Sequence, residues 1–502
     1  RFHHDAPVAI TSPAAYRDAL REARVLVDQN ERRALIAEQV LGLANKGEVV
    51  ALSDDLLDEV TGLVEWPTAL RGSFDPEFLA VPAQALISAM KTHQKYFHLN
   101  DARSGSLLPA FITVANIESQ QPEQVVSGNE RVIRPRLSDA AFFFANDKQT
   151  PLISRQERLG SVVFQHHLGS LLGKTHRIVA ITKQLADAIG ADEATAVRAA
   201  ALSKCDLVSE MVLEFPELQG IAGAEYARHD DEPAGVAEAI GYHYYPRFAG
   251  DKLPPSPEAT AVALADRLDT LVGIFGIGEP PTGSKDPFAL RRASLAVIRM
   301  LINLKKPLSL SELLQAVVEQ HTAELSPHTP DVVSHYITER LGNWYDDDGI
   351  NISVVRAALA AGATDLFDID LRVRALNAFA KTETAEHLAA ANKRVANILA
   401  KADNLDGTLA DPNLFVHEAE HALHEAISRV GSTLAPLLAD RNYQSALDEL
   451  AQLRGPVDAF FDGVMVNAED PAERLNRLRL LDGLRALFTQ VADLALLSSA
   501  AE

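Results

Sequence analysis

The feature that most constrains the fold of this chain is a change of pattern at Pro151. From there to the end, Ala/Leu-rich segments with helical spacing replace the strand-like pattern of the first 150 residues. The helical segments are interrupted by residues that end helices, at Gly220, Pro246, Pro254, Pro280, Pro307, Pro327, Pro330 and Gly362. A chain of 502 residues divides into about three or four domains. The pattern therefore predicts a mostly α, multidomain protein.

The first 150 residues differ because helical and extended patterns alternate in them. Residues 17–46 have apolar side chains near helical spacing and predict one helix. Residues 82–93 predict a second helix, which its proline opens. Two extended runs, 96–99 and 110–115, flank a turn and predict a β-hairpin. We therefore expect residues 1–150 to form a mixed α/β domain.

Positive charge is concentrated in two segments of an acidic chain. The formal net charge is -22, which argues against a polyanionic partner because nucleic-acid affinity depends on Lys and Arg. Yet residues 131–177 hold eight basic side chains against three acidic ones, and residues 281–306 hold six against one. We call these segments the first and second basic islands. They predict local anion binding, although solvated helix faces would explain them as well.

Cysteine usage and hydropathy bear on where the protein works. Cys205 is the single cysteine, which excludes an intramolecular disulfide framework and is typical of a reducing compartment. No apolar run approaches the ~20 residues that cross a bilayer. The start, Arg1 to Asp5, has neither an initiator Met nor a signal-type apolar segment. We expect a cytoplasmic protein, present here in N-terminally shortened form, without a membrane or DNA partner.

Five long strings, spread in order over the chain, carry a family resemblance. They are Val64-Glu65-Trp66-Pro67, Met90-Lys91-Thr92-His93-Gln94-Lys95-Tyr96-Phe97, Gly128-Asn129-Glu130-Arg131-Val132, Glu214-Phe215-Pro216-Glu217-Leu218-Gln219-Gly220 and Thr282-Gly283-Ser284-Lys285-Asp286-Pro287-Phe288. The chain resembles the β subunits of bacterial heterotetrameric glycyl-tRNA synthetases. The match is weakest over residues 307–440, where only helical character is evident.

The C-terminal stretch from Val457 to Leu481 is similar to the helical anticodon-binding domain that this family shares with arginyl-type synthetases. Four of its apolar residues follow helical spacing and predict a core-facing stripe, namely Val457, Phe460, Phe461 and Val464. Arg474, Asn476 and Arg477 lie off that stripe. These three side chains are candidates for contact with RNA, whose single-stranded loops are read by stacking and hydrogen bonds. A solvated helix surface would explain each of them as well.

The central helical region resembles the His-Asp phosphohydrolase superfamily, in which Asp266 matches the last metal-ligating aspartate. A divalent metal there needs a His-Asp doublet, and the matching segment, 200–208, contains no histidine. A doublet does occur at His229-Asp230, but the next residues read as a loop. We expect a degenerate scaffold over residues 151–320. A metal-dependent phosphohydrolase that uses Asp266, His229 and Asp230 stays open as an alternative.

A second alternative is a zinc peptidase. The string His417-Glu418-Ala419-Glu420-His421 matches the zincin pattern, in which two histidines four apart on a helix bind zinc. His424 is too close to serve as the third histidine of a metzincin. The solvated face of an ordinary Ala-rich helix explains the same residues, and we expect no metal site in this chain.

The family resemblance implies a ligase, glycine–tRNA ligase, assembled from two α and two β subunits. That complex uses ATP and Mg²⁺ to charge glycine onto tRNA(Gly). The sequence contains no P-loop, no Rossmann fingerprint and no class I or class II synthetase signature, so the resemblance places the adenylation site in the α subunit. We expect no catalytic residue and no bound cofactor in this chain.

The resemblance also gives the basic islands their expected roles. Arg131, Arg134 and Arg136 are expected to contact the tRNA backbone. Lys285, Arg291 and Arg292 are expected to face either the acceptor end or the α subunit. Proline clustering and the change at Asp411-Pro412 place boundaries near residues 320 and 405, which leaves 321–405 as a helical linker and 406–502 as the anticodon-binding bundle.

Overall fold

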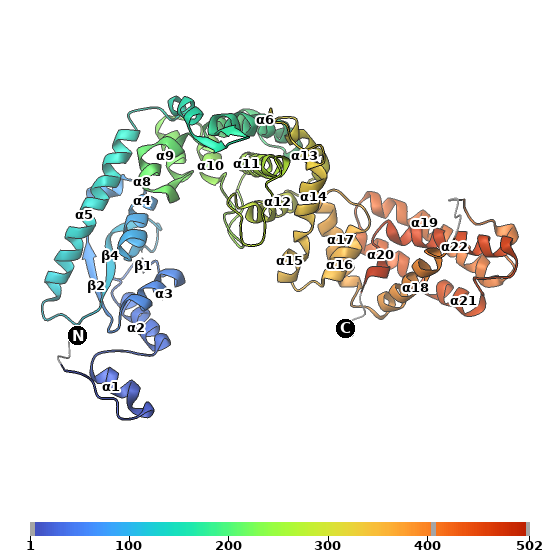
Figure 1. Cartoon of the computed structure of the whole chain (residues 1–502), viewed down its shortest axis with the longest axis horizontal. Helices are drawn as coiled ribbons and strands as arrows, with labels where there is room; N and C mark the ends of the chain where they lie inside the picture. The colour runs from blue at the N-terminus through green and yellow to red at the C-terminus, as the bar shows by residue number, and fades with distance from the viewer. Residues whose placement is uncertain (1–5, 403–407, 498–502) are drawn as a thin grey trace. The chain divides into compact units, whose positions relative to one another are not determined.

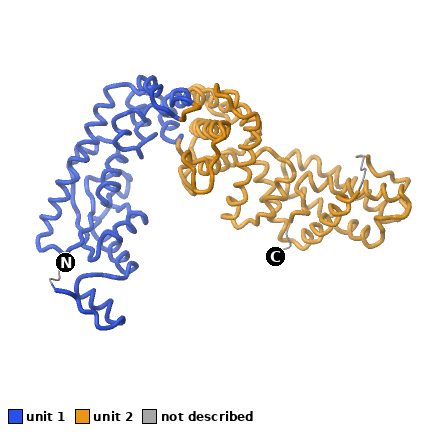
Figure 2. The backbone as a smooth tube through the Cα atoms, in the orientation of Figure 1, with its two compact units in different colours: residues 1–164, 169–175, 198–243 blue, residues 165–168, 176–197, 244–502 orange. Residues whose placement is uncertain are grey.

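The computed structural model describes residues 6–402 and 408–497 (Figure 1). The chain divides into two compact units (Figure 2). Unit 1 comprises residues 1–164, 169–175 and 198–243, and unit 2 comprises residues 165–168, 176–197 and 244–502. The described residues are mostly helical, with a small antiparallel sheet near the N-terminus, as the sequence predicts.

The sheet of unit 1 has four antiparallel strands in the order β1-β3-β4-β2. They are β1 (Glu48–Val50), β2 (Thr68–Ser73), β3 (Phe97–Asp101) and β4 (Leu107–Ala115). β3 and β4 form the hairpin predicted at residues 96–115, and β2 pairs with β4 over its whole length, from Thr68 opposite Ala115 to Ser73 opposite Ala110.

Helices cover one face of this sheet, and successive residues of a strand point to opposite faces. Ile112 of β4 and Phe97 of β3 pack there against Ile36 and Leu57. Those two residues belong to α2 (Gln29–Gly42) and α3 (Asp54–Leu63).

The prediction of a single helix over residues 17–46 is wrong. The structure has α1 (Tyr16–Glu22) and then α2, with Arg24 at a φ of 61° between them. The Asp28 carboxylate accepts hydrogen bonds from the amides of Asn30 and Glu31, and so starts a new helix. Over residues 82–93 the structure has α4 (Ala83–Ser88), preceded by Pro82 and followed by a π-helical turn.

The other face of the sheet carries the long helix α5 (Pro122–Asp147). Phe111 of β4 points to this face, and its ring stacks on Tyr96 with 4.5 Å between the ring centroids. A Cβ atom on Gly72 would lie 2.4 Å from the Phe111 ring, so the neighbouring strand needs glycine there. The Tyr96 hydroxyl donates to Asn129 Oδ1 of α5 at 2.6 Å. These contacts fix which side of α5 meets solvent.

The remainder of unit 1 is mainly helical, but residues beyond Pro151 are not purely so. A short two-stranded sheet, β5 (Val163–Gln165) with β6 (Gly169–Ser170), interrupts the helical pattern that the sequence predicted. The helices that follow are α6 (Leu171–Ile189), α7 (Glu193–Leu202), α8 (Glu210–Glu214), α9 (Ile221–His229) and α10 (Ala234–Tyr242). The division between the units falls within α6 and α7.

Beyond residue 244, unit 2 is built of helices. They are α11 (Pro257–Gly276), α12 (Leu290–Leu304), α13 (Leu310–Val318), α14 (Thr329–Thr338), α15 (Arg340–Asp347), α16 (Ile352–Leu359), α17 (Leu366–Phe379), α18 (Glu383–Leu399), α19 (Glu418–Ala439), α20 (Tyr443–Ala451), α21 (Arg454–Gly463) and α22 (Pro471–Thr489). Side-chain caps start several of them, for example Ser256 before α11 and Asp470 before α22.

Candidate nucleic-acid interface

The outward face of α5 carries part of the first basic island. Arg131 and Arg134 are exposed and make no ion pair with a described residue. They share this face with Ser138 and with Phe142, whose side chain is 59% exposed, because positions i, i+3, i+7 and i+11 lie along one side of a helix. On the inward side, Glu130 Oε1 accepts from the amide and hydroxyl of Ser73, at 2.8 and 2.9 Å.

Arg136 lies on a different side of α5. Its guanidinium is 3.7 Å from the Glu214 carboxylate of α8, and both side chains are partly exposed. The structure therefore brings Arg131 and Arg134 together and directs Arg136 toward an acidic neighbour.

The second basic island is also divided by the fold. Lys285 is exposed on a turn in which its amide donates to the Thr282 carbonyl at 2.7 Å. Arg291 donates to the Gly283 carbonyl, whereas Arg292 is exposed on α12. The Asp286 carboxylate accepts from the amides that begin α12 and thereby holds the turn against the helix. Seven of the eight basic residues of the first island are in unit 1, whereas Arg177 and the whole second island are in unit 2.

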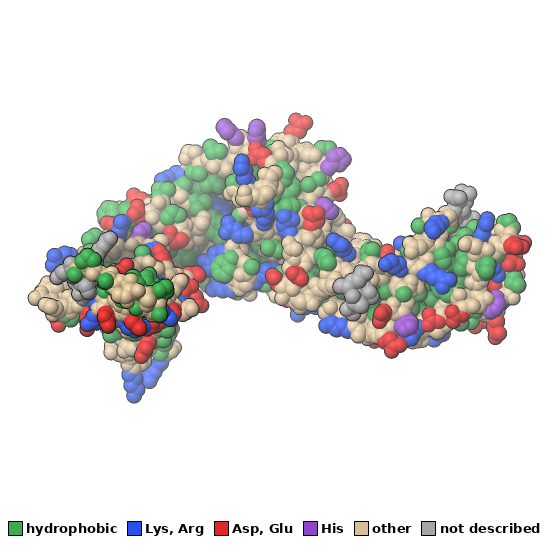
Figure 3. Space-filling view, turned by 60° about the horizontal axis from the view of Figure 1, so that its bottom comes forward, with side chains coloured by type: hydrophobic (Ala, Val, Ile, Leu, Met, Phe, Trp, Pro, Cys, Tyr) green, Lys and Arg blue, Asp and Glu red, His purple; other side chains and the backbone are tan. Residues whose placement is uncertain are grey.

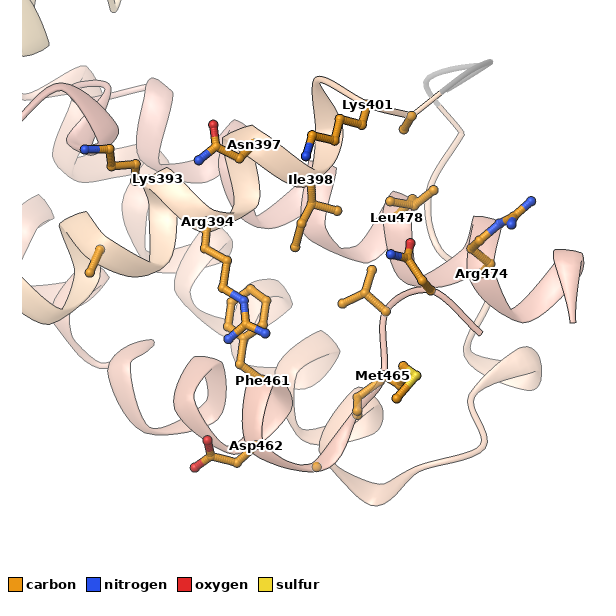
Figure 4. A pocket seen from close by; sticks show the side chains of 16 residues that line it. Lys393, Arg394, Asn397, Ile398, Lys401, Phe461, Asp462, Met465, Arg474 and Leu478 are labelled. Carbon is orange, nitrogen blue, oxygen red and sulfur yellow. The ribbon is translucent and has the colours of Figure 1, made fainter. Parts of the chain in front are cut away.

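A large open pocket lies in the C-terminal helices, with a volume of about 1180 Å³ (Figure 4). One wall is the last part of α18, and the other is the end of α21, the following loop and the start of α22. Its polar and aromatic lining residues are Lys393, Arg394, Asn397, Lys401, Phe461, Asp462, Asn467 and Arg474. In the view of Figure 3, Lys and Arg side chains gather with hydrophobic ones over these helices, and acidic side chains lie toward the edge.

A cation and an aromatic ring are stacked inside this pocket. The Arg394 guanidinium lies 4.2 Å from the centroid of the Phe461 ring (Figure 4). Met465 is 76% exposed on the loop after α21. Phe461 is therefore not a core residue as the apolar stripe predicted: Phe460 is fully buried, while Phe461 is half-buried on the pocket wall. The apolar stripe on α21 is therefore wider than the part of this helix that neighbouring helices cover.

Of the three C-terminal residues expected to meet RNA, Arg474 is exposed and lines the pocket. Asn476 and Arg477 are buried. The Asn476 side chain accepts from the Asp411 amide at 2.7 Å and donates to the Asp411 carbonyl at 3.0 Å. Both of its hydrogen-bonding ends are thus used within the fold, which corrects its expected exposure.

Arg477 is buried beneath the loop that follows α21, and its side chain holds this loop in place. Its Nε donates to Glu420 Oε1 at 2.8 Å, and another guanidinium nitrogen donates to the Met465 carbonyl at 3.0 Å. Burial opposes ionisation of Glu420, yet hydrogen bonds from Arg477 and from two backbone amides outweigh it, so the pKa of Glu420 is lowered. Arg477 is a positioning residue for the loop and presents no free face to RNA.

Sequence reasoning missed the basic wall on α18. Lys393, Arg394, Asn397 and Lys401 recur at spacings that share one helix face, and that pattern is visible in the sequence. A boundary predicted near residue 405 separates them from the other wall, so the two halves of the pocket were assigned to different segments.

The residues of the two metal-site patterns have structural roles or lie in different units. His417 is the N-cap of α19, where its Nδ1 accepts from the Ala419 amide at 3.2 Å and Glu420 completes a capping box. It therefore lies outside the helix that the zincin pattern requires. Asp230 accepts from the Leu152 amide at 2.6 Å. His229 and Asp230 are in unit 1, whereas Asp266 is in unit 2. Within residues 6–402 and 408–497, no cluster of three or more His, Cys, Asp and Glu could hold a metal ion.

Comparison with known proteins identifies the family. Residues 1–360 match the family model of the glycyl-tRNA synthetase beta subunit, and residues 388–497 match that of the DALR anticodon binding domain. The glycine–tRNA ligase beta subunit of Chromohalobacter salexigens is 53% identical over 497 residues, covering 99% of this chain and 72% of the relative. The corresponding subunit of Azotobacter vinelandii is 50% identical over 499 residues, covering 99% and 73%. Among the helices of residues 6–402 and 408–497, none combines the length and the apolar composition that a membrane span requires. The chain belongs to the glycyl-tRNA synthetase beta-subunit family and carries a DALR anticodon-binding domain.

Proposed function

We propose that this β subunit binds tRNA(Gly) and positions it for glycylation by an α subunit, with the pocket between α18 and α21 receiving the anticodon loop. The observation that carries the proposal is the composition of this pocket. Among the described residues that line it, four are cationic, Lys393, Arg394, Lys401 and Arg474, and one is acidic, Asp462. It falls inside the segment that matches the anticodon-binding family model.

The pocket chemistry suits unpaired nucleotides. Bases of single-stranded loops stack on aromatic rings and on guanidinium planes, and their edges take hydrogen bonds from amide side chains. Phe461 supports the plane of Arg394 from one side, and Asn397 and Asn467 supply amides. Lys393, Lys401 and Arg474 are then available for phosphates.

Arg131 and Arg134 give a second contact in this proposal. Both are exposed on one face of α5 and have no acidic partner among the described residues. Phosphate contacts of this kind position RNA without reading its sequence. Arg136 contributes less, since Glu214 is its neighbour.

The assembly follows from the family in the same proposal. Relatives are named beta subunits of glycine–tRNA ligase, and this name supports an α partner. Two α and two β subunits, the use of ATP and Mg²⁺ through the α subunit, and a cytoplasmic location are what the family resemblance implies, and they are part of this proposal. We keep the four segments 1–150, 151–320, 321–405 and 406–502 as proposed domains. The compact units are larger than these segments.

A degenerate His-Asp scaffold in 151–320 is part of this proposal. Asp206, in the segment that resembles the doublet helix, is fully buried, and its Oδ2 accepts from the amides of Gly220 at 2.6 Å and Gly223 at 3.0 Å. Burial raises the pKa of Asp206 to about 6. This carboxylate organises backbone, which supports a structural role for the segment.

The proposal is tested by tRNA binding to the intact chain. Phe461→Ala removes the ring beneath Arg394, and loss of one stacked base should weaken tRNA(Gly) binding about fivefold or more, from the ~1 to 3 kcal/mol of a base–aromatic stack. Lys381→Ala is the matched control, because this exposed lysine lies outside the pocket.

Binding of tRNA(Gly) with substituted anticodon bases completes the test. The wild-type chain should distinguish the substituted tRNA, and Phe461→Ala should lose part of that discrimination. If Phe461→Ala and Lys381→Ala bind each of the two tRNAs with equal affinity, the proposal that this pocket receives the anticodon loop is wrong.

A further inference from the structure

A second cavity in unit 2 lies away from the anticodon-domain pocket. It has a volume of about 290 Å³, room for a ligand of nucleotide size but not for a helix. Three segments line it: the loop 246–250, the outer face of α12 and the end of α15. The lining side chains with polar or aromatic groups are Phe248, Arg292, Arg299, Asn343, Trp344, Asp347 and Asp348.

The wall from α12 presents two arginines with different tasks. Arg292, Leu295 and Arg299 follow i, i+3, i+7 spacing and line the cavity together. Arg299 donates to the Asp251 carbonyl at 2.6 Å and to the Phe248 carbonyl at 3.4 Å, so it is occupied in holding the loop. Arg292 is exposed and makes no ion pair with any residue in 6–402 or 408–497. Its guanidinium is the cation that remains for a ligand.

The loop is fixed while its aromatic side chain stays in solvent. Asp251 Oδ2 accepts from the Arg247 amide at 2.9 Å and from Arg247 Nε at 3.0 Å. The Arg247 guanidinium packs over the Tyr245 ring at 4.4 Å. Nevertheless the Phe248 side chain is 57% exposed. The anchored loop therefore holds the Phe248 ring in a defined position at the cavity, which lowers the ordering cost of a ligand contact there.

The opposite wall completes the set of groups that recognise a base. Trp344 is half-buried beside the cavity, and Asn343 and Asp347 are exposed next to it. Asp348 is already 3.5 Å from Arg374. Aromatic faces, one free arginine and short polar acceptors are the means by which proteins hold an unpaired nucleotide.

From this geometry we infer that the cavity takes one unpaired nucleotide of the bound RNA. The base stacks at Phe248 and Trp344, and its phosphate lies at Arg292. The carboxylate of Asp347 repels phosphate, so it faces the base, where it accepts a hydrogen bond from an exocyclic amino group. Bases with an amino group are therefore preferred over uracil. The inference rests on the proposed RNA-binding function and assigns part of the second basic island to RNA.

The test uses tryptophan fluorescence of the full chain. The sequence has two tryptophans, Trp66 and Trp344, so Trp66→Phe leaves Trp344 as the single reporter. Adding AMP, and then a short single-stranded RNA, should quench this fluorescence saturably. UMP should quench more weakly, and inorganic phosphate should not quench. Phe248→Ala and Arg292→Ala, each in the Trp66→Phe chain, should weaken AMP binding about tenfold, as expected when a stacked base or a charge contact is lost. Lys381→Ala, an exposed lysine outside the cavity and outside the second basic island, is the control.

The outcomes separate this inference from the proposed function. If nucleotides do not change the Trp344 fluorescence and Phe248→Ala binds tRNA(Gly) with normal affinity, the inference is wrong while the proposed tRNA binding stands. Quenching by the α subunit without RNA would overturn it in favour of a protein partner. If tRNA(Gly) does not bind the chain but AMP quenches Trp344 and Phe248→Ala abolishes the effect, the proposed function fails and the nucleotide site remains.

Discussion

Arg474 and Arg477 show how much three positions on one helix can change the role of an arginine. Arg474 opens into the pocket, whereas Arg477 is buried against Glu420 and the Met465 carbonyl. Removing one partner of a buried ion pair leaves the other charge without compensation, which is costlier than removing both. The two residues therefore call for different experiments.

We expect Arg477→Met to lower the free energy of unfolding of the C-terminal helices by about 3 to 5 kcal/mol, because Glu420 would stay buried and charged. The double variant Glu420→Gln/Arg477→Met should recover much of this loss, and Arg474→Ala should cost little. Thermal and urea unfolding of the full chain measure these differences. Unchanged stability with weakened tRNA binding in Arg477→Met would show instead that Arg477 contacts RNA.

The pH dependence of the same pair has a definite sign. The pKa of Glu420 is lowered from its ordinary value of 4.5 in the folded chain. Its ionised form thus adds stability at pH values above 4.5, and this contribution is lost as the pH falls through the folded-state pKa. The stability difference between the wild type and the double variant should become less favourable to the wild type below about pH 4.5.

At the scale of elements, α5 is the clearest case of a helix whose neighbours decide its function. Tyr96 and Ser73 bind its inner side through Asn129 and Glu130. The outer side then has to carry Arg131 and Arg134, since these positions lie away from the sheet. Spacing alone gives the two sides of the helix but does not say which one meets solvent.

The proposed role of α5 predicts a contrast between its arginines. Arg131→Ala/Arg134→Ala should flatten the plot of log tRNA affinity against log salt by about 0.7 to 0.9 for each phosphate contact removed. Arg136→Ala should leave the slope nearly unchanged, because its exposed pair with Glu214 contributes only ~0 to 1 kcal/mol. Binding titrations over a range of KCl concentrations give the slopes. An unaltered slope in the double variant would contradict backbone contacts by α5.

At the scale of the whole molecule, the proposed function divides glycine activation and tRNA binding between an α subunit and this chain. Its sequence carries none of the adenylate-forming signatures, whereas its relatives are named as one subunit of a ligase. A β subunit of this kind is therefore expected to act on tRNA while the α subunit activates glycine.

We expect the isolated chain to show no glycine-dependent ATP–pyrophosphate exchange, and tRNA(Gly) charging to appear only when the α subunit is added. The α subunit alone is the control for exchange. Pyrophosphate exchange by the chain without α, in a preparation shown to be free of it, would mean that an adenylation site lies here after all.

The sequence by itself determined the helical class, the hairpin of β3 and β4, and the family. Those features depend on local spacing and on long ordered sequence strings. Both can be recognised without knowing which segments pack against each other. Apolar spacing also located Phe460 in the core.

Only the tertiary structure decided which charged residues lie together. It joined Lys393, Arg394 and Lys401 to a wall that begins at Phe461, sixty or more residues further along the chain. It also buried Asn476 and Arg477 beside the exposed Arg474. It also separated Arg136 from Arg131 and Arg134, and Arg291 from Arg292. The physical reason is that periodicity defines the faces of a helix, whereas the surroundings of each face depend on segments distant in sequence.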